Sequence, residues 1–403
     1  MTTFAAAAIV SAGVAAALHV GKIPPALPEL RQAFGLSLLQ ASYLISALQM
    51  ASVTMGIVGG MMADRLGPKR VMIAGLGLLT VGSLVSTLVG NAWLLLLLRL
   101  VESVGFMLTV LPGPSLLRRS LGAAMSRWLG IWGSYMPSGM ALAMICSPPL
   151  LSLGGWHLPW SLAAAASALV LLAVLLSVQA DPARSSAQAG VVQLIRMTVS
   201  SPGPWLLALA FGCYAAQWMS VFAFLPTIYS EAGIAMSRAG PLSAFAVAVN
   251  IIGNLLGGFA VQRRIPVPAV MVFAALTMAS MSWLAFGSGA SFEWRYGAVV
   301  VLSLISGMIP GSLFSTAPKL APDPGAISTT VGLMQQGSSA GQVIAPPLIA
   351  ALATATGGWN SSWWVTGLFA IGNIVAAVLL IPVLARVQSR SSLAASSSLA
   401  RDS

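Results

Sequence analysis

Twelve long apolar runs alternate with short polar connections along the whole chain. Each run holds roughly 20 mostly apolar residues, the length that an α-helix needs to cross the hydrocarbon core of a bilayer. The runs lie near residues 5–27, 38–62, 71–89, 93–116, 127–150, 160–179, 203–226, 238–261, 266–287, 296–317, 327–353 and 363–385. The pattern therefore predicts an all-α membrane protein with about 12 transmembrane helices.

The composition excludes other classes of protein. Hydrophobic residues make up 58% of the 403-residue chain and charged residues only 7%, whereas a soluble domain carries roughly 25% charged residues. So few charges cannot cover a water-facing surface, and so many apolar residues exclude disorder. The net charge of +11 does not indicate nucleic-acid binding, because the basic residues are spread over short connections and form no single block. We therefore expect a lipid bilayer around the chain and no nucleic-acid partner.

Positive charge is distributed unevenly between the two ends of the predicted helices. With the N-terminus placed inside the cell, fourteen Lys and Arg residues fall in inside segments and three fall outside, while Lys22 and Arg99 lie within helices. Connections rich in Lys and Arg stay in the cytoplasm. The bias predicts a multi-pass protein of the bacterial inner (plasma) membrane with both termini in the cytoplasm.

The two halves of the chain match each other at an offset of 198 residues. Leu27-Pro28 matches Leu225-Pro226, Gly59-Gly60 matches Gly257-Gly258, and Pro148-Pro149-Leu150 matches Pro346-Pro347-Leu348. Internal repeats of this size are common in secondary transporters. We predict an N-terminal six-helix bundle at 1–180, a polar cytoplasmic linker at 181–202, a C-terminal six-helix bundle at 203–386 and a disordered, Ser-rich cytoplasmic tail at 387–403.

The predicted loop after the second helix carries a recognisable motif. It runs Gly60-Met61-Met62-Ala63-Asp64-Arg65-Leu66-Gly67-Pro68-Lys69-Arg70, which resembles the G-x-x-x-D-R-x-G-x-K/R-R signature of the major facilitator superfamily. The resemblance implies the major facilitator fold, with two pseudo-symmetric six-helix bundles that rock about a central site. It also implies a conformational latch, formed by Gly60, Asp64, Arg65, Gly67, Lys69 and Arg70, in which Gly67 permits a tight turn.

Two further segments resemble one subgroup of that superfamily. Residues 25–37, together with Gly212-Cys213-Tyr214 and Phe224-Leu225-Pro226, are similar to the cyanate and nitroimidazole permeases. Drug–proton antiporters have a Gly-Pro pair in the fifth helix, where this chain has Met136 before Pro137. The departure argues against drug efflux.

Four ionisable residues fall inside predicted helices of the first half: His19, Lys22, Arg99 and Glu102. Such residues cost at least about 2.5–3.5 kcal/mol in a bilayer, so they usually mark a functional site. By resemblance, helices 1, 4, 7 and 10 line the central cavity, and we expect all four residues to face it.

In this hypothesis Lys22 and Arg99 bind an anionic substrate, and Tyr214 and Gln217 of the seventh helix hydrogen-bond it from the other half. Glu102, with His19 beside it, is the proton-coupling candidate. The alternative is structural, since Arg99 and Glu102 at i, i+3 can neutralise each other while Lys22 extends toward the interface.

The sequence thus predicts a secondary active transporter that moves a small, anionic organic or inorganic solute by alternating access, either as a uniporter or coupled to H⁺. The rivals are a drug or metabolite efflux antiporter and, from another class, a non-transporting membrane sensor.

We expect no enzyme, no cofactor and no metal site. The chain lacks a G-x-x-x-x-G-K-[ST] loop and clustered metal ligands. Residues 337–341 match the hydrolase pattern G-x-S-x-G, but they lie in an apolar run, where small residues serve helix packing. A small-molecule substrate is the expected partner of a monomeric chain.

Overall fold

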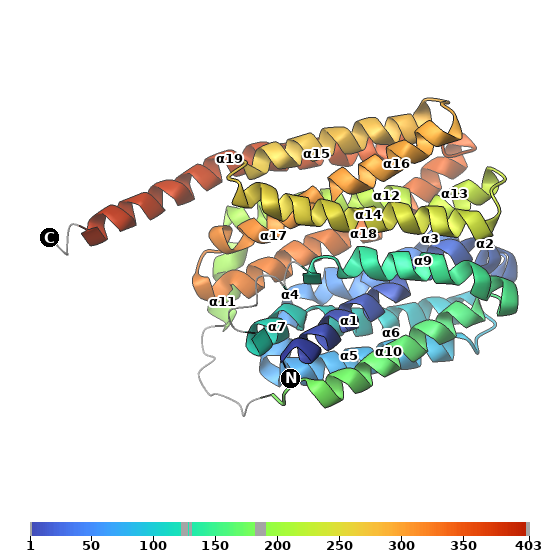
Figure 1. The fold of residues 1–403 in the computed structure, drawn as a ribbon, viewed down its shortest axis with the longest axis horizontal. Coiled ribbons are helices and arrows are strands. Elements are labelled where there is room, and N and C mark those ends of the chain that lie inside the picture. The colour runs from blue at the N-terminus through green and yellow to red at the C-terminus, as the bar shows by residue number, and fades with distance from the viewer. Residues whose placement is uncertain (1, 122–127, 129–130, 182–190, 400–403) are drawn as a thin grey trace.

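The computed structural model describes residues 2–121, 128, 131–181 and 191–399, and this part of the chain is helical without strands (Figure 1). Twelve of the described helical segments are long and apolar enough to cross a membrane. The apolar runs of the sequence predict these spans, and the prediction of an all-α membrane fold is confirmed.

The first half forms six spans. Its elements are α1 (Thr2–Gly21), α2 (Ile23–Phe34), α3 (Leu38–Ser46), the 3₁₀ turn η1 (Ala47–Gln49), α4 (Met50–Leu66), α5 (Pro68–Ser86), α6 (Ala92–Val110), α7 (Gly113–Leu121), α9 (Tyr135–Gly154) and α10 (His157–Ser177). The second span is therefore made of α3, η1 and α4, with a 3₁₀ turn in its middle.

The second half forms six more spans after the short helix α11 (Val191–Val199). Its elements are α12 (Pro202–Phe222), α13 (Leu225–Glu231), α14 (Met236–Gln262), α15 (Val267–Ser282), the π-helical turn η3 (Trp283–Gly287), α16 (Phe292–Ser306), α17 (Met308–Leu320), the 3₁₀ turn η4 (Pro324–Ala326), α18 (Ile327–Thr356) and α19 (Trp363–Leu399).

Local sequence signals explain how the chain turns between spans. At the first turn Gly35 adopts φ 62° and closes α2, a left-handed conformation that glycine adopts readily. Ser37 and Gln40 then form a reciprocal capping box at the start of α3, with hydrogen bonds of 3.2 and 2.9 Å. The turn satisfies its own backbone groups at the membrane surface.

The two halves lie side by side in Figure 1, the first in blue to green and the second in yellow to red. They meet mainly along two seams. In one, α18 packs against α3, η1 and α4; in the other, α9 packs against α14. We call these the polar seam and the apolar seam, for reasons given by their contacts below. A smaller contact joins α2 to α13.

The apolar seam depends on a glycine. A Cβ built on Gly240 of α14 would lie 2.3 Å from Cγ of Pro148 and 2.8 Å from the carbonyl oxygen of Met144, both on α9. Only a residue without a side chain permits this approach.

Small residues also bring α12 and α18 together inside the second half. A Cβ on Gly341 would lie 2.1 Å from the carbonyl oxygen of Gly212. The residues that match G-x-S-x-G thus belong to a continuous helix packed on another helix, and the strand–turn–helix elbow of a hydrolase is not formed there.

Outward faces of both halves carry exposed large apolar side chains, among them Leu153, Leu169 and Ile371 at 79%, 69% and 62% exposure. Surfaces of this kind are covered by lipid in a membrane protein.

The structure differs from the sequence prediction in three places. The first span continues as α2 to Phe34 instead of ending near residue 27, because Pro24 and Pro25 stand in the first turn of α2, where no backbone N–H is needed. The predicted linker contains α11. The predicted disordered tail is helical to Leu399, since extending an existing helix costs far less than starting one. Residues 400–403 lie outside the described chain.

Candidate functional site

A pocket of about 60 Å³ lies where the two halves meet. Its lining comes from α9 of the first half and from α12, α14, α17 and α18 of the second. The lining residues are Gly133, Tyr135, Met136, Pro137, Phe211, Tyr214, Ala215, Trp218, Asn250, Asn254, Pro310, Phe314, Gln335, Ser338 and Gln342. We call this the central pocket. A space of this size holds a few water molecules or a very small solute.

The central pocket is lined by aromatic rings and carboxamides, and these lining residues include no Lys, Arg, His, Asp or Glu. Phe211 stacks on Tyr214 with ring centroids 5.8 Å apart and meets Phe314 edge-on at 5.6 Å. The Trp218 indole N–H is buried without a hydrogen-bond partner. A ligand here would find flat apolar walls, and one of these rings carries a buried donor that has no partner in the described residues.

Some carboxamides of the pocket already have partners. Asn250 Nδ2 donates to the Ser303 carbonyl at 3.0 Å and to Ser306 Oγ at 2.9 Å, and Asn254 Nδ2 donates to Asn250 Oδ1 at 2.9 Å. Tyr135 and Gln335 are hydrogen-bonded to each other across the two halves. The pocket is therefore built by side chains that also hold the helices together.

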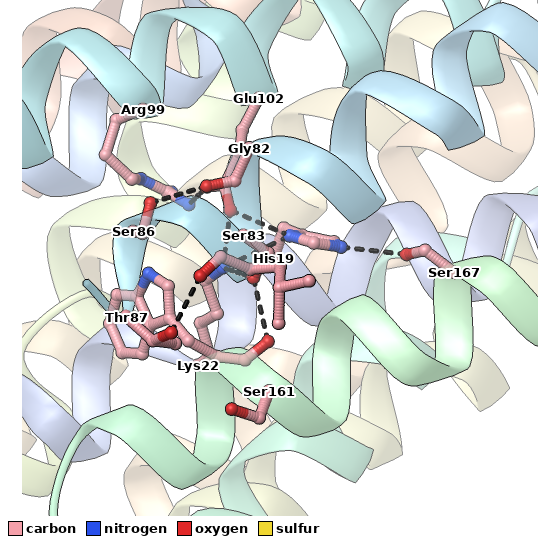
Figure 2. A network of polar contacts seen from close by, with 12 residues as sticks. His19, Lys22, Gly82, Ser83, Ser86, Thr87, Arg99, Glu102, Ser161 and Ser167 are labelled. Carbon is pink, nitrogen blue, oxygen red and sulfur yellow. Dashed lines mark hydrogen bonds and ion pairs between the residues drawn. The ribbon is translucent and has the colours of Figure 1, made fainter.

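His19, Lys22, Arg99 and Glu102 come together as a second site, which we call the charged cluster (Figure 2). Lys22 Nζ lies 2.7 Å from Glu102 Oε1, and Arg99 Nη1 forms an ion pair with Glu102 Oε2. At most 1% of each residue is exposed. The Glu102 carboxylate thus forms ion pairs with two cations, one from helix 1 and one from helix 4.

The Lys22 ammonium has a full set of acceptors. It donates to Glu102 at 2.7 Å, to Ser83 Oγ at 2.8 Å and to His19 Nδ1 at 3.1 Å, which uses its three N–H bonds. It also lies 4.6 Å from the centroid of the Trp160 ring. His19 Nδ1 lies 3.1 Å from Lys22 Nζ and 3.2 Å from Glu102 Oε1, and its Nε2 lies 2.9 Å from Ser167 Oγ; the tautomer of the ring decides in which of these contacts it donates.

The charged cluster is not electrically balanced. With Lys22 and Arg99 cationic, Glu102 anionic and His19 neutral, it holds one net positive charge. The ion pairs of the described residues supply no second anion to it, and Arg99 Nη2 is buried without a hydrogen-bond partner. A buried, uncompensated charge is costly and attracts an anion.

None of these four residues lines the central pocket, and their role in transport stays a prediction. His19 and Lys22 point instead toward Ser167 of α10 and Ser83 of α5, and Arg99 toward the Leu44 carbonyl of α3. The reason is mutual satisfaction: buried ionisable groups on α1 and α6 gain more from each other than from a small apolar pocket. The structural pairing of Arg99 with Glu102 is observed, whereas Lys22 does not extend to the interface.

Of the two residues predicted on the seventh span, only Tyr214 lines the central pocket. Gln217 is fully buried and donates from Nε2 to the Thr366 carbonyl of α19 at 3.0 Å. Sequence reasoning missed Trp218 and Tyr135 as lining residues. The available signal was an aromatic residue with a polar atom inside a span. This signal is weak, because such residues are also common at the membrane interface.

The predicted latch is described in part, because the surroundings of Gly60 and the side chains of Asp64 and Arg65 lie outside what the structure describes. Gly67 has φ 97°, and a Cβ there would lie 2.3 Å from Asp181 Oδ2. Lys69 Nζ donates to the carbonyls of Leu175 and Val178 at 2.9 and 2.6 Å. The loop is thereby fixed to the end of α10.

Asp181 is the centre of this contact and was not predicted as part of the latch. Its carboxylate accepts the backbone N–H groups of Lys69 and Arg70, each at 3.1 Å, and Nη1 of Arg119 at 2.8 Å. It acts as a distant N-cap for α5. Burial alone raises the pKa of Asp181, but the hydrogen bonds from Arg119, Arg70 and Lys69 outweigh it and hold that pKa below its usual value.

Comparison with known proteins gives a consistent result. A sequence profile of the Major Facilitator Superfamily matches residues 3–336. The cyanate transport protein CynX of Escherichia coli K12 is 25% identical over 90% of this chain and 93% of its own length. A 3-(3-hydroxy-phenyl)propionate transporter of the same strain is 26% identical over 81% of this chain and 82% of its own. The methylenomycin A resistance protein of Bacillus subtilis 168 is 26% identical over only 35% of this chain.

Among solved structures, a bacterial homologue of the human lysosomal transporter Spinster in an inward-facing, occupied conformation has a TM-score of 0.76. It is 17% identical, and the match covers 96% of this chain and 97% of that one. At this identity the likeness concerns the fold alone.

Proposed function

The chain belongs to the major facilitator superfamily, and we propose that it is a secondary active transporter for a small anionic solute. As a member of this family it is a membrane transporter and not an enzyme. The solute class, the coupling to protons and the orientation in the inner membrane belong to the proposal.

The observation that carries the anionic class is the net positive charge of the charged cluster. A charge buried in a low-dielectric interior acts over a longer range than one in water. We infer that this charge favours an anion over a cation in the central pocket, whose own lining is uncharged. The unpaired Nη2 of Arg99 adds a donor that other conformations of helices 1 and 4 can offer to the same anion.

The relatives support the same class. Two of the relatives matched over at least 81% of this chain are, by name, transporters of cyanate and of 3-(3-hydroxy-phenyl)propionate, and both solutes are anions near neutral pH. The resistance protein, whose name points to efflux, matches a much shorter stretch. We therefore place the anion transporter ahead of drug efflux and of a sensor.

Proton coupling rests on the continuity of the charged cluster. Glu102 Oε1 lies 2.7 Å from Lys22 Nζ and 3.2 Å from His19 Nδ1, so a proton taken up by one group changes the charge seen by the others. In alternating access the two halves tilt about the central pocket while the cluster gains and loses that proton.

Uptake into proteoliposomes tests the anion class. The purified chain should accumulate an isotope-labelled anion from a panel of cyanate, benzoate and 3-phenylpropionate. Lys22→Met, which reduces the net charge of the cluster to zero, should lower this uptake at least tenfold. Arg196→Gln, an exposed cytoplasmic charge, is the matched control and should leave it unchanged. Transport of lipophilic cations alone would instead establish the efflux antiporter, and no flux of any solute would favour the sensor.

A pH gradient tests the coupling. An alkaline interior should raise accumulation of the anion, whereas a uniporter would only equilibrate it. Glu102→Gln should keep solute exchange between the two sides but lose the accumulation. Because this variant carries an extra net charge, Lys22→Met/Glu102→Gln, which restores the net charge of +1, should be examined beside it.

The orientation is tested by reporter fusions. Both termini should report a cytoplasmic location, as the distribution of Lys and Arg predicts. Blue-native electrophoresis and light scattering of the purified protein should report a monomer.

A further inference from the structure

Three hydrogen bonds of the polar seam come from a single turn of the second span. Ser46 Oγ donates to the Val343 carbonyl of α18 at 2.9 Å. Gln49 Nε2 donates to Gln342 Oε1 at 3.1 Å, and Ser339 Oγ donates to Gln49 Oε1 at 3.1 Å. The η1 turn and the serine before it therefore bind the first half to the second.

The backbone of the η1 turn explains why Ser46 and Gln49 reach the same helix. The turn follows Ser46 and takes in residues 47–49. In a 3₁₀ helix, with about 3 residues per turn, side chains three residues apart eclipse each other. In an α-helix, with about 3.6 residues per turn, the same two side chains would be rotated apart by about 60° and the segment would be shorter by about 1.5 Å. The 3₁₀ form thus aligns both side chains toward α18.

A carbonyl before the η1 turn is bonded by a side chain of α6. The last α-type bond of α3 runs from the Ala47 N–H to the Tyr43 carbonyl. The next carbonyl along the chain, that of Leu44, accepts Arg99 Nε at 3.2 Å. The same guanidinium forms an ion pair with Glu102 through Nη1, so the turn adjoins the charged cluster.

An N–H after the η1 turn is bonded by a second side chain of α6. In an α-helix the Ala47 carbonyl would accept the Ala51 N–H, but here it accepts the Met50 N–H. The Ala51 N–H donates to Ser103 Oγ at 2.9 Å. Arg99 and Ser103 lie one helical turn apart on α6, and both are fully buried. The two side chains thus satisfy backbone groups on either side of the 3₁₀ turn.

We propose that Ser103 is a positioning residue for the polar seam: by accepting the Ala51 N–H it keeps residues 47–49 in the 3₁₀ form, and this form keeps the seam closed. When the two halves tilt apart at the seam, the turn becomes α-helical, and each carbonyl accepts the N–H four residues ahead. Ser103 acts only through the turn, because its described hydrogen bond goes to the second span. The inference rests on the proposed function for the tilting, but not for the state of the empty seam.

Disulfide crosslinking across the polar seam tests the proposal without a solute. A Cβ on Gly56 of α4 would lie 3.3 Å from Cβ of Gln336 on α18, close to the separation found in disulfides. The rate of disulfide formation by Gly56→Cys/Gln336→Cys, in a Cys146→Ser/Cys213→Ala background, therefore reports how tightly the seam is closed. Ser103→Ala should slow it several-fold, because the turn is no longer held in the 3₁₀ form.

The matched control is Ser86→Ala. Ser86 is equally buried in the first half, and its hydroxyl bonds to the Gly82 carbonyl of its own helix. This variant should crosslink like the parent. If Ser103→Ala does not fold, Ser103→Gly removes the same hydroxyl oxygen and should slow crosslinking as well.

A second comparison distinguishes positioning of the turn from a general loss of packing. With Ser46→Ala and Gln49→Leu already in place, the turn presents no hydrogen-bonding side chains to α18. Adding Ser103→Ala to this background should then slow crosslinking no further, because the residues act along one route. Slowing by the same factor in both backgrounds would show that Ser103 acts independently of the turn, and it would overturn the proposal.

Uptake of anions separates this inference from the proposed function. If the parent transports no anion of the panel, the proposed function fails, while crosslinking still decides on Ser103. If the parent transports normally and Ser103→Ala crosslinks as fast as Ser86→Ala, only the positioning role of Ser103 is overturned.

Discussion

Lys22 Nζ and Glu102 Oε1 lie 2.7 Å apart across 80 residues of sequence, in the interior of the first half. The contact joins the junction of α1 and α2 to the middle of α6. The Glu102 carboxylate also forms an ion pair with Arg99. It is therefore the single described anion of a cluster with two cations. The stability of the bundle and the charge available for transport therefore depend on the same three side chains.

Replacement of Glu102 by Gln should destabilise the protein strongly. The variant leaves two buried cations with a neutral partner, and breaking a buried ion pair from one side costs about 3–5 kcal/mol. Thermal unfolding of the detergent-purified protein measures the loss. Lys22→Met/Glu102→Gln should recover part of it, because the net charge returns to that of the parent; a double variant less stable than Glu102→Gln would contradict this electrostatic account.

Asp181→Asn should destabilise the contact between α5 and the end of α10 by about 1 kcal/mol, since the side chain loses its charge-assisted hydrogen bonds. The pKa of Asp181 is held below its usual value in the folded protein. Its contribution is therefore complete above the unfolded pKa of about 4 and is lost as the pH falls through the folded value.

The difference in unfolding free energy between parent and Asp181→Asn should accordingly be constant from pH 7 to pH 5 and shrink on further acidification. A difference that grows in acid would show that the sign of the effect is reversed. The backbone N–H groups of Lys69 and Arg70 donate hydrogen bonds to Asp181. Their rate of hydrogen exchange gives a local readout of the same change.

A pair of glycines on α18 tests the packing of the second half. Gly341→Ala places a Cβ 2.1 Å from the Gly212 carbonyl oxygen and should cost about 1–3 kcal/mol as α18 moves off α12. Gly332→Ala meets no atom within 4 Å and should be neutral or stabilise by about 0.5–1 kcal/mol. Comparable melting temperatures for the two variants would show that α12 and α18 do not approach as closely as described.

Trp218→Phe should weaken solute binding while leaving the fold intact. The change removes the unpaired indole N–H of the central pocket and keeps an aromatic wall, so affinity should fall about fivefold, the value of one hydrogen bond. Titration of the labelled anion by equilibrium dialysis measures it. Trp364→Phe, on a side chain 63% exposed to the surroundings, is the matched control; equal affinities in both variants would exclude the indole from the site.

The membrane architecture could be predicted from the sequence because each span must be apolar along its whole length, so that every residue of a run contributes to the signal. The i, i+3 spacings of His19 with Lys22 and of Arg99 with Glu102 likewise predicted that each pair shares a helix face. The direction of those faces could not be predicted, because it depends on how α1 packs against α5, α6 and α10.

The central pocket shows the same limit. Gln217 and Gln342 are both carboxamides inside apolar helices, and nothing local distinguishes them. In the structure Gln217 donates to the Thr366 carbonyl, whereas Gln342 lines the pocket and accepts from Gln49. Which role a carboxamide takes is decided by the neighbour it meets across the interface, and that neighbour lies about 150 or 290 residues away in sequence.

The excess positive charge of the first half has an electrical consequence. It is fixed to helices, so any tilt of that half shifts it along the direction in which the membrane voltage falls. Complete transfer of one elementary charge is worth about 2.3 kcal/mol at 100 mV, and a shift across a tenth of the membrane about 0.2 kcal/mol. The resting voltage of the cell thus biases which side of the membrane the empty carrier faces.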